Sequence, residues 1–448
     1  MNGGTFTPGQ EKERAGIYFR FTSAAQKRIS VGERGTVAIP LELSWGESKK
    51  FIEINDEDDV KKKLGLDIKD PSLLLLREVK KKSKTVKLYK VNDGTPAKAS
   101  LGDDITATAI CGGTKGNDLL IRISSNVLDE TKKDVTTYLF NQVVDKQTVS
   151  KAEDLNKNAF VIFEGKGELT NHAGLKLSGG DDGKVTNLDY TDFLAAAEKE
   201  YFDVIGLPVD GEEQLKTAFV SFIKRIRDQQ GIKVVGVLPN YAADHEGVIN
   251  VTNGVVLEDG HVLEPAEAVA WVAGASAGAS MNQSLTFVQY EGAIDVSERL
   301  DNDEIIDRLN KGEFLFTFDP RDKTVSVEKD INSFVSFTSE KFKKFSKNKI
   351  IRILDAINND LTRELKEEIK DRKERGIDIP VNDDGIQIIN TLSAIYLKEL
   401  QSGGAIKNFD AENDILIEVT DDDDGFNIKL YAQPVDAGEK YYVGVEVR

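Results

Sequence analysis

Residues 264–293 read EPAEAVAWVAGASAGASMNQSLTFVQYEGA, and this stretch decides the fold. From Glu264 to Met281 every residue is small or apolar except Glu264, Glu267 and two serines. A helix with so little bulk and charge is stable only when another layer of the protein packs closely against it. Pro265 suits the first helical turn, where its missing N–H costs nothing. The stretch therefore predicts a buried helix.

A continuous apolar run precedes this helix. Residues 232–238 (IKVVGVL) have the pattern of a strand that is covered on both faces. A buried strand followed by a buried helix indicates an α/β domain, in which helices lie on the faces of a sheet.

The helix also contains a pattern that is typical of hydrolases. Residues 274–278 (GASAG) fit G-x-S-x-G, with Ser276 as the nucleophile. That site needs a strand before the serine and a histidine after it, but all three histidines precede Ser276: His172, His245 and His261. The apolar residues on both sides favour one continuous helix. An α/β hydrolase is therefore the disfavoured alternative, and we predict no enzyme activity, no catalytic residue and no cofactor site.

Length and charge restrict the remaining function classes. A chain of 448 residues predicts about three domains. The net charge of −18 argues against nucleic acid as a partner, because phosphate binding needs clustered basic residues. The basic cluster at residues 80–82, with Lys84, Lys87 and Lys90, is interpreted as a solvated face.

The cysteine content argues against a thiolate metal site, and the length of the apolar runs argues against a membrane-spanning segment. Cys111 is the single cysteine, which leaves no disulfide framework and no thiolate metal site, and it is predicted to be a buried strand residue. The first sixteen residues lack the apolar core of a signal peptide. No run is long enough to span a bilayer, so we expect a protein made in a cytoplasm and not inserted into a membrane.

Changes in the pattern of strand-like and helix-like runs divide the chain into segments. Strands alternate with helices before residue 92 and after 184, whereas the residues between carry short strand-like runs separated by Gly, Asn and Asp. Beyond residue 335, two helices (341–375 and 386–400) precede two strands (414–419 and 426–432). The sequence thus predicts a mixed α+β, multidomain protein: a flexible arm (1–20), a layered α/β core (21–91 with 185–335), an inserted all-β module (92–184), a C-terminal α+β domain (336–438) and a final strand (439–448).

The final strand has two interpretations. In KYYVGVEVR, residues 440–448, one face carries Tyr441, Val443, Val445 and Val447. The strand either completes the sheet of its own domain or adds to the sheet edge of a neighbour. The preceding residues 434–438 (PVDAG) are expected to be flexible enough to let it leave. A head-to-tail contact of this kind builds rings or open helices.

Two long stretches resemble a known family. The central stretch (VLPNYAADHEGVINVTNGV, then AVAWVAGASAGASMNQSLTFVQYEGA) and the C-terminal unit (GEFLFTFDPRDKTVSVEKDINSFVSFT to YYVGVEVR) resemble tail sheath proteins of contractile bacteriophage tails. The likeness is greatest to the short sheath proteins of prophages and phage-tail-like bacteriocins. It covers residues 32–91 and 190–448. A sheath of a related contractile injection system is an alternative that sequence hardly separates.

The resemblance implies a mechanical function. Sheath subunits form a helical homopolymer around an inner tail tube protein, between baseplate and tail terminator proteins, in the tail of a virion or phage-like particle. On a baseplate signal the polymer contracts and drives the tube through a target envelope. Residues 1–20 and 439–448 would hook into neighbouring subunits, the C-terminal domain would face the tube, and no nucleotide would be hydrolysed.

An acidic run near the C-terminus is a candidate metal-binding loop. Asp421–Asp424 followed by Gly425 has the look of a calcium loop, but it lacks the alternating ligand positions and the closing glutamate. A solvated hairpin turn is the favoured interpretation, with contact to a basic patch on the tube as the alternative. No metal site is predicted.

Overall fold

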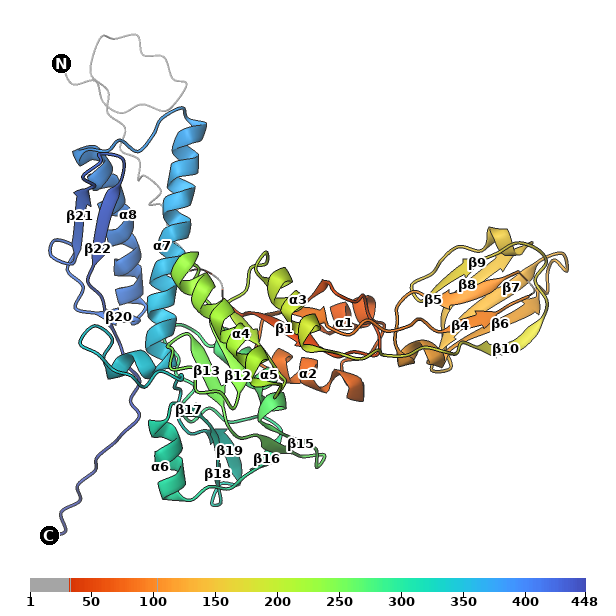
Figure 1. Ribbon diagram of the computed structural model, residues 1–448, viewed down its shortest axis with the longest axis horizontal. Coiled ribbons are helices and arrows are strands. Elements are labelled where there is room, and N and C mark those ends of the chain that lie inside the picture. Colours follow the sequence, from red (N-terminus) through yellow and green to blue (C-terminus); the bar gives the residue numbers. More distant parts are fainter. Residues whose placement is uncertain (1–31, 33, 103) are drawn as a thin grey trace, which may run out of the picture.

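The computed structural model describes residue 32, residues 34–102 and residues 104–448. The predicted arm at residues 1–20 lies outside this part of the chain. Figure 1 shows a central layered body, a β-rich module that projects to one side, and two long helices on the other side. Helices and strands are mixed and belong to several separate sheets, which confirms the predicted mixed α+β, multidomain class.

A seven-stranded sheet forms the middle of the body, in the order β17-β13-β12-β11-β1-β3-β2. All neighbouring strands are parallel except β2, which is antiparallel to β3. The strands are β1 (Thr36–Leu41), β2 (Phe51–Ile54), β3 (Thr85–Lys90), β11 (Val204–Gly206), β12 (Val235–Pro239), β13 (Val248–Val251) and β17 (Glu313–Phe314). The strand predicted at 232–238 begins at Val235, because the amide and carbonyl groups of Lys233 bond to the Asn359 side chain instead of to a strand.

The predicted central helix is α5 (Pro265–Gly278), which covers one face of this sheet. Its small residues serve a close contact with α2 (Leu74–Lys80) and the turn that follows it. A side chain on Gly274 would collide with the carbonyl oxygen of Val79, and one on Gly278 with that of Lys82. The expectation that another layer presses against this helix is therefore confirmed.

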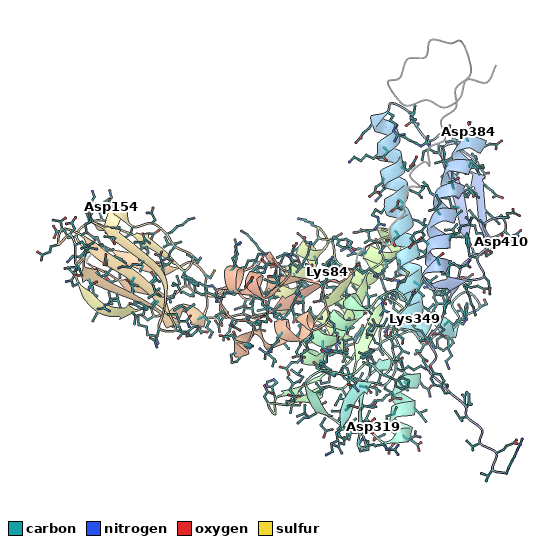
Figure 2. The ribbon with its side chains drawn as sticks, turned by 180° about the vertical axis from the view of Figure 1, so that it is seen from behind. Lys84, Asp154, Asp319, Lys349, Asp384 and Asp410 are labelled. Atoms are coloured by element: carbon teal, nitrogen blue, oxygen red, sulfur yellow. The ribbon has the colours of Figure 1, made fainter. Side chains whose placement is uncertain are left out.

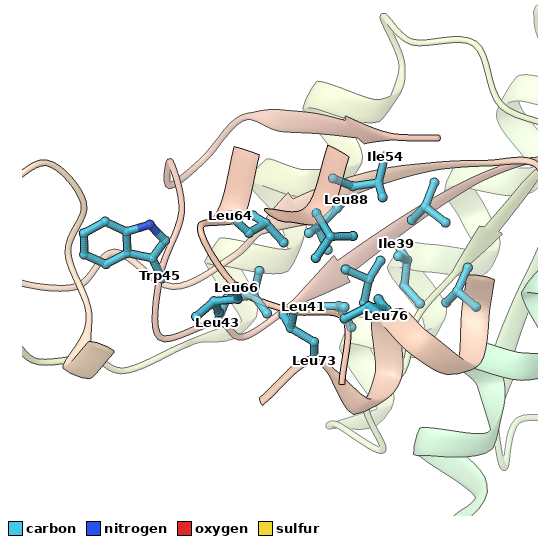
Figure 3. Close-up of a cluster of buried hydrophobic side chains, with 14 of the residues drawn as sticks. Ile39, Leu41, Leu43, Trp45, Ile54, Leu64, Leu66, Leu73, Leu76 and Leu88 are labelled. Carbon is cyan, nitrogen blue, oxygen red and sulfur yellow. The ribbon is translucent and has the colours of Figure 1, made fainter. Parts of the chain in front are cut away.

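Apolar side chains fill both faces of the sheet. On the α5 side, Trp271 is fully buried and stacks on Tyr290, with ring centroids 4.6 Å apart. This core continues under α1 (Glu57–Leu64), α2 and the short helix η1 (Pro71–Leu73), where leucines and isoleucines interlock (Figure 3). The opposite face is covered by α3 (Asn187–Ala197) and α4 (Glu213–Lys224), and α4 continues as a π-helical turn, Arg225–Gln229.

The inserted module consists of two antiparallel sheets, ordered β4-β5-β9 and β10-β6-β7-β8. It contains β4 (Lys98–Ser100), β5 (Thr106–Ala109), β6 (Leu119–Ser125), β7 (Lys133–Leu139), β8 (Gln142–Val149), β9 (Val161–Glu164), β10 (His172–Lys176), η2 (Thr114–Asp118) and η3 (Ala152–Asp154). Lys90 fastens the module to the body, because its buried ammonium group donates to the carbonyl oxygens of Gly112, at 2.6 Å, and Gly46, at 3.3 Å. Cys111 is partly buried but lies beyond the end of β5, so its predicted strand position is wrong.

Smaller elements close the body below the main sheet. They are β14 (Val255–Leu257), β15 (Val262–Leu263), β16 (Ala293–Val296), β18 (Phe316–Asp319), β19 (Thr324–Val327) and α6 (Asn302–Asn310). Phe316 reaches from β18 to pack edge-on against Trp271, which joins these strands to the main core.

The C-terminal unit is built on two long helices, α7 (Asn348–Glu374) and α8 (Asp383–Ser402). Tyr396 on α8 donates to the carboxylate of Asp360 on α7, at 2.8 Å. The helix predicted at 341–375 begins late, because the Asn332 side chain bonds the carbonyl group of Phe345 and holds η5 (Lys343–Ser346) as a 3-10 turn. The strands are β20 (Ile406–Lys407), β21 (Ile415–Val419), β22 (Phe426–Leu430) and β23 (Gln433–Pro434).

Candidate assembly interface

The hairpin of β21 and β22 in the C-terminal unit is small, and both of its edges are unpaired among the described residues. β21 and β22 form an antiparallel hairpin, and within the described residues neither strand pairs with a third. Ile415 and Ile417 pack toward α8, whereas Leu416 is exposed on the other face. A two-stranded sheet is marginally stable by itself and gains from every added strand. The hairpin therefore offers two edges that can accept a strand.

The predicted inter-subunit strand is in solvent. Figure 1 shows the C-terminal end extending away from the rest of the molecule. Residues 440–448 pair with no described strand. The four side chains that share one face of the predicted strand are largely exposed: Tyr441 by 79%, Val443 by 82%, Val445 by 81% and Val447 by 95%. An apolar alternation without a partner is the pattern of a segment that binds elsewhere.

The expectation of a flexible leader at residues 434–438 is wrong. Pro434 belongs to β23, and the Val435 amide donates to the carbonyl group of Ala405, at 2.8 Å. The Lys347 ammonium group then bonds Asp436 at 2.7 Å and Glu439 at 3.0 Å. The chain is thus held to the body up to Glu439.

Lys347 is tuned for this anchoring role. Burial by itself would lower the pKa of its ammonium group, but the hydrogen bonds to Asp436 and Glu439 outweigh burial and raise the pKa. The cation is therefore fully charged at neutral pH. It fixes the point from which the last nine residues depart.

The acidic run Asp421–Asp424 occupies the turn between β21 and β22, as the hairpin interpretation predicted. All four side chains are exposed. In the part of the chain that the structure describes, no three His, Cys, Asp or Glu side chains are grouped closely enough to hold a metal ion.

Sequence reasoning missed a second basic cluster. It named only the lysines near residue 80, yet Lys329, Lys343, Lys344, Lys347 and Lys440 line one groove where the C-terminal segment leaves the body. The run KFKKFSKNK at residues 341–349 was the available signal. The apolar spacing of this run predicts a helix, and helical spacing alone assigns no separate role to its positive charge.

The structure places Ser276 inside α5, so the strand–turn–helix of a hydrolase nucleophile is not formed. The side chain is buried among the helix-packing residues. His245 lies in the loop before β13, where its Nδ1 accepts from the Gly247 amide at 3.0 Å. His172 lies on β10 in the module, and His261 is on the surface before β15. No helix among the described residues has the length and apolar content needed to span a membrane.

Four family models match consecutive parts of the chain. They are the tail sheath protein Gp18 domain III N-terminal region at residues 34–91, the phage tail sheath protein beta-sandwich domain at 92–182, the phage tail sheath protein central domain at 183–333 and the phage tail sheath C-terminal domain at 340–448.

Individual proteins agree with these matches. The chain is 59% identical to the XkdK protein of the phage-like element PBSX of Bacillus subtilis, over 100% of both sequences. The crystal structure of a sheath tail protein from Listeria innocua is similar, with a TM-score of 0.82, 53% identity, and 93% of this chain and 96% of that chain covered. The helical sheath of the anti-feeding prophage, in its contracted state, shares the fold at 13% identity, with a TM-score of 0.58 over 97% of this chain and 99% of that one. This chain belongs to the phage tail sheath protein family.

Proposed function

We propose that this chain is the repeating subunit of a contractile sheath, and that residues 439–448 are donated as a strand to a neighbouring subunit. One observation carries the proposal. An exposed, alternating segment is anchored at Glu439, and the same C-terminal unit carries a two-stranded sheet whose edges are unpaired among the described residues. Such a segment and such an edge are complementary, and chain-to-chain addition continues indefinitely unless the rotation closes a ring.

The energetics favour a lattice over a pair. A strand of this length forms a handful of backbone hydrogen bonds, each contributing roughly 1 kcal/mol. Association of two free subunits costs at least about 4 kcal/mol, which cancels most of this gain. In a polymer each subunit donates one strand and receives another, so the contacts reinforce each other. The tether then permits large rotations between subunits without dissociation.

The remaining parts of the proposal follow from membership in the family. The polymer surrounds an inner tail tube, is bounded by baseplate and tail terminator proteins, and shortens to drive the tube through a target envelope. The subunit is made in the bacterial cytoplasm and works in the tail of a phage or phage-like particle. A relative with the same fold forms a helical sheath that is known in a contracted state, which supports contraction here.

Electron microscopy of the purified chain, alone and with its tube protein, tests strand donation. The full chain is expected to form tubes, and a chain that ends at Gly438 is expected to stay monomeric with an unchanged thermal midpoint. Normal polymers from the shortened chain would overturn the proposal. Unfolding of the shortened chain would show instead that the strand completes its own sheet.

A matched pair of variants tests which face of the strand is buried. Val443→Asp with Val445→Asp places two charges on the face expected to pack inward, and should abolish tubes. Tyr442→Asp with Gly444→Asp adds the same charges to the other face, and should leave most of the assembly intact. Equal loss in both variants would contradict the predicted orientation.

A further inference from the structure

The lysine-lined groove at the root of the C-terminal segment carries an unbalanced charge. Its volume is about 470 Å³, and it lies between η5 and residues 437–440. Lys347 is paired with Asp436 and Glu439. The other four lysines of the groove have no side-chain hydrogen bond or ion pair to any described residue: Lys329, Lys343, Lys344 and Lys440. On a protein with a net charge of −18, this groove is a local excess of positive charge.

Lys329 shows the cost of this arrangement. The ammonium group is half-buried, and burial lowers its pKa; the carboxylate of Glu439 opposes the effect, whereas the nearby cations of Lys347 and Lys343 add to it. A partly buried cation among like charges is stabilised by an incoming anion. The groove is therefore built to receive negative charge.

Negative charge without partners lies at the opposite end of the C-terminal unit. In the turn Asp421–Asp424, Asp424 accepts from the Thr420 hydroxyl group at 3.1 Å. The other three aspartates have no side-chain partner among the residues described. The turn lies beside the start of α8, because the ring of Phe426 packs at Gly385.

The two ends are well separated on one subunit. Figure 2 shows Asp384, at the start of α8, and Lys349, beside the groove, at opposite ends of the C-terminal unit. Helix α7 spans most of this length, and its 27 residues correspond to about 40 Å. The charges of one chain therefore cannot neutralise each other, but those of two successive chains can.

We propose that the acidic turn Asp421–Asp424 of one copy docks in the lysine groove of the next copy and forms an ionic contact at the root of the donated strand. This inference rests on the proposed strand donation. Lys440 lines the groove and also lies at the start of the proposed strand. When the strand pairs with the hairpin of the neighbouring subunit, the groove of the donor must therefore lie at one end of that hairpin.

The carboxylates without hydrogen-bond partners indicate which end of the hairpin binds the groove. At its base, the Asp410 carboxylate already accepts from the Asn413 side chain at 2.6 Å, and the Asp414 carboxylate accepts from the Asp410 amide at 2.8 Å. At its turn, the side chains of Asp421–Asp423 have no partner in the part of the chain that the structure describes. The donated strand then begins at the turn and runs toward the base, antiparallel to β21, which is the more stable pairing. The contact thus sets the direction and register of donation.

A charge exchange tests the contact in the full-length protein. Lys343→Glu with Lys344→Glu, or Asp421→Lys with Asp422→Lys, should raise the protein concentration needed for polymerisation by about tenfold or more. All four changes in one chain should restore assembly, because the signs are exchanged and the contact re-forms. Lys61→Glu with Lys62→Glu, on the exposed face of α1, repeats the first charge change at a distant surface and should have little effect.

The outcomes separate this inference from strand donation itself. If removal of residues 439–448 abolishes tubes while both charge variants assemble normally, donation stands and the ionic contact is wrong. If the full chain forms no polymer with its tube protein, strand donation fails first. If the aspartate variant polymerises normally and loses only its association with the tube, the turn contacts the tube, which overturns the inference.

Cross-linking tests the direction. With Cys111→Ser as background, Lys440→Cys combined with Asp422→Cys should give a ladder of disulfide-linked chains under oxidation. Lys440→Cys combined with Asp410→Cys, at the base of the hairpin, should give none. The reverse result would place the groove at the base and overturn the proposed docking.

Discussion

Arg227 and Asp355 form a buried bidentate ion pair that joins the body to the C-terminal unit. The Nη1···Oδ2 and Nη2···Oδ1 distances are 2.7 and 2.8 Å, and both side chains are only 4% exposed. Arg227 lies in the π-helical turn after α4, and its Nη1 also donates to the carbonyl group of Val234 at 2.7 Å. Asp355 lies on α7. The two parts are therefore fixed to each other, so a pull on the proposed donated strand would be passed to the whole subunit.

Breaking this pair should destabilise the protein strongly. Asp355→Ala leaves a buried guanidinium group without its anion, and we expect a loss of about 3–5 kcal/mol in the free energy of unfolding. Arg227→Met combined with Asp355→Leu should recover much of that loss. Denaturant unfolding of the monomer gives the measurement.

An exposed pair serves as the control. Arg299 and Asp295 are also bidentate, at 3.0 and 2.8 Å, but their side chains are 60% and 32% exposed. Asp295→Ala should cost less than about 1 kcal/mol. Equal losses at the two sites would show that the buried pair has no special role.

Because α5 is closely packed, we expect an alanine substitution in it to change stability in the direction opposite to that given by helix propensity. Gly274→Ala should favour the helix by about 1 kcal/mol on propensity alone. Its new methyl group would collide with the carbonyl oxygen of Val79, and overpacking costs roughly 1–3 kcal/mol. We therefore expect a lower thermal midpoint. Gly403→Ala at the end of α8 is the control, because its added methyl group would lie 3.4 Å from the nearest atom, the carbonyl oxygen of Glu399. A Gly274→Ala protein that is more stable than the wild type would refute the packing argument.

Many elements of this fold follow from local residue patterns, and the sequence predicted those elements. The apolar run of β12 and the small residues of α5 depend on neighbours in the sequence. The late start of α7 and of β12 was not predictable, because it depends on the distant side chains of Asn332 and Asn359. Local periodicity carries no record of such bonds.

The candidate interface was predicted in part for the same reason. The alternation of residues 441–447 is visible in the sequence, whereas its anchor at Lys347 joins residues about ninety positions apart. The lysine groove likewise gathers Lys329, Lys343 and Lys440 from three separate segments. Tertiary structure alone brings these charges together.

Stability should fall in mild acid because of His245. Its buried imidazole is neutral, and burial lowers its pKa below the ordinary value; Glu246 opposes this and Arg227 adds to it. Because the folded pKa is below the unfolded value of about 6.5, the unfolded chain binds the proton more readily, and stability is lost as pH falls through and below that value.

His245→Asn tests this assignment. Its side-chain oxygen can still accept from the Gly247 amide, but it does not titrate. Denaturation midpoints at pH 7, 6 and 5 should fall less steeply in the variant than in the wild type. Parallel curves would assign the acid sensitivity to other groups.

Loss of the Lys347 anchor should free the leader of the C-terminal segment. Lys347→Met removes both ion pairs, and we expect amide hydrogen exchange at residues 435–440 to accelerate by about tenfold or more. The stability of the monomer should change by less than about 1 kcal/mol, because these pairs are partly exposed. Lys344→Met, which removes a lysine without a described partner, should leave the exchange unchanged; equal protection in both proteins would contradict the anchoring role.

We propose that residues 441–447 form a strand of the neighbouring subunit's sheet. Cryo-electron microscopy of the assembled polymer tests it most directly, because the chain can be traced from Glu439 into the lattice. We expect density for this segment beside β21 of the next subunit, with Tyr441, Val443, Val445 and Val447 facing its α8. The segment paired within its own subunit, or outside every sheet, would contradict strand donation.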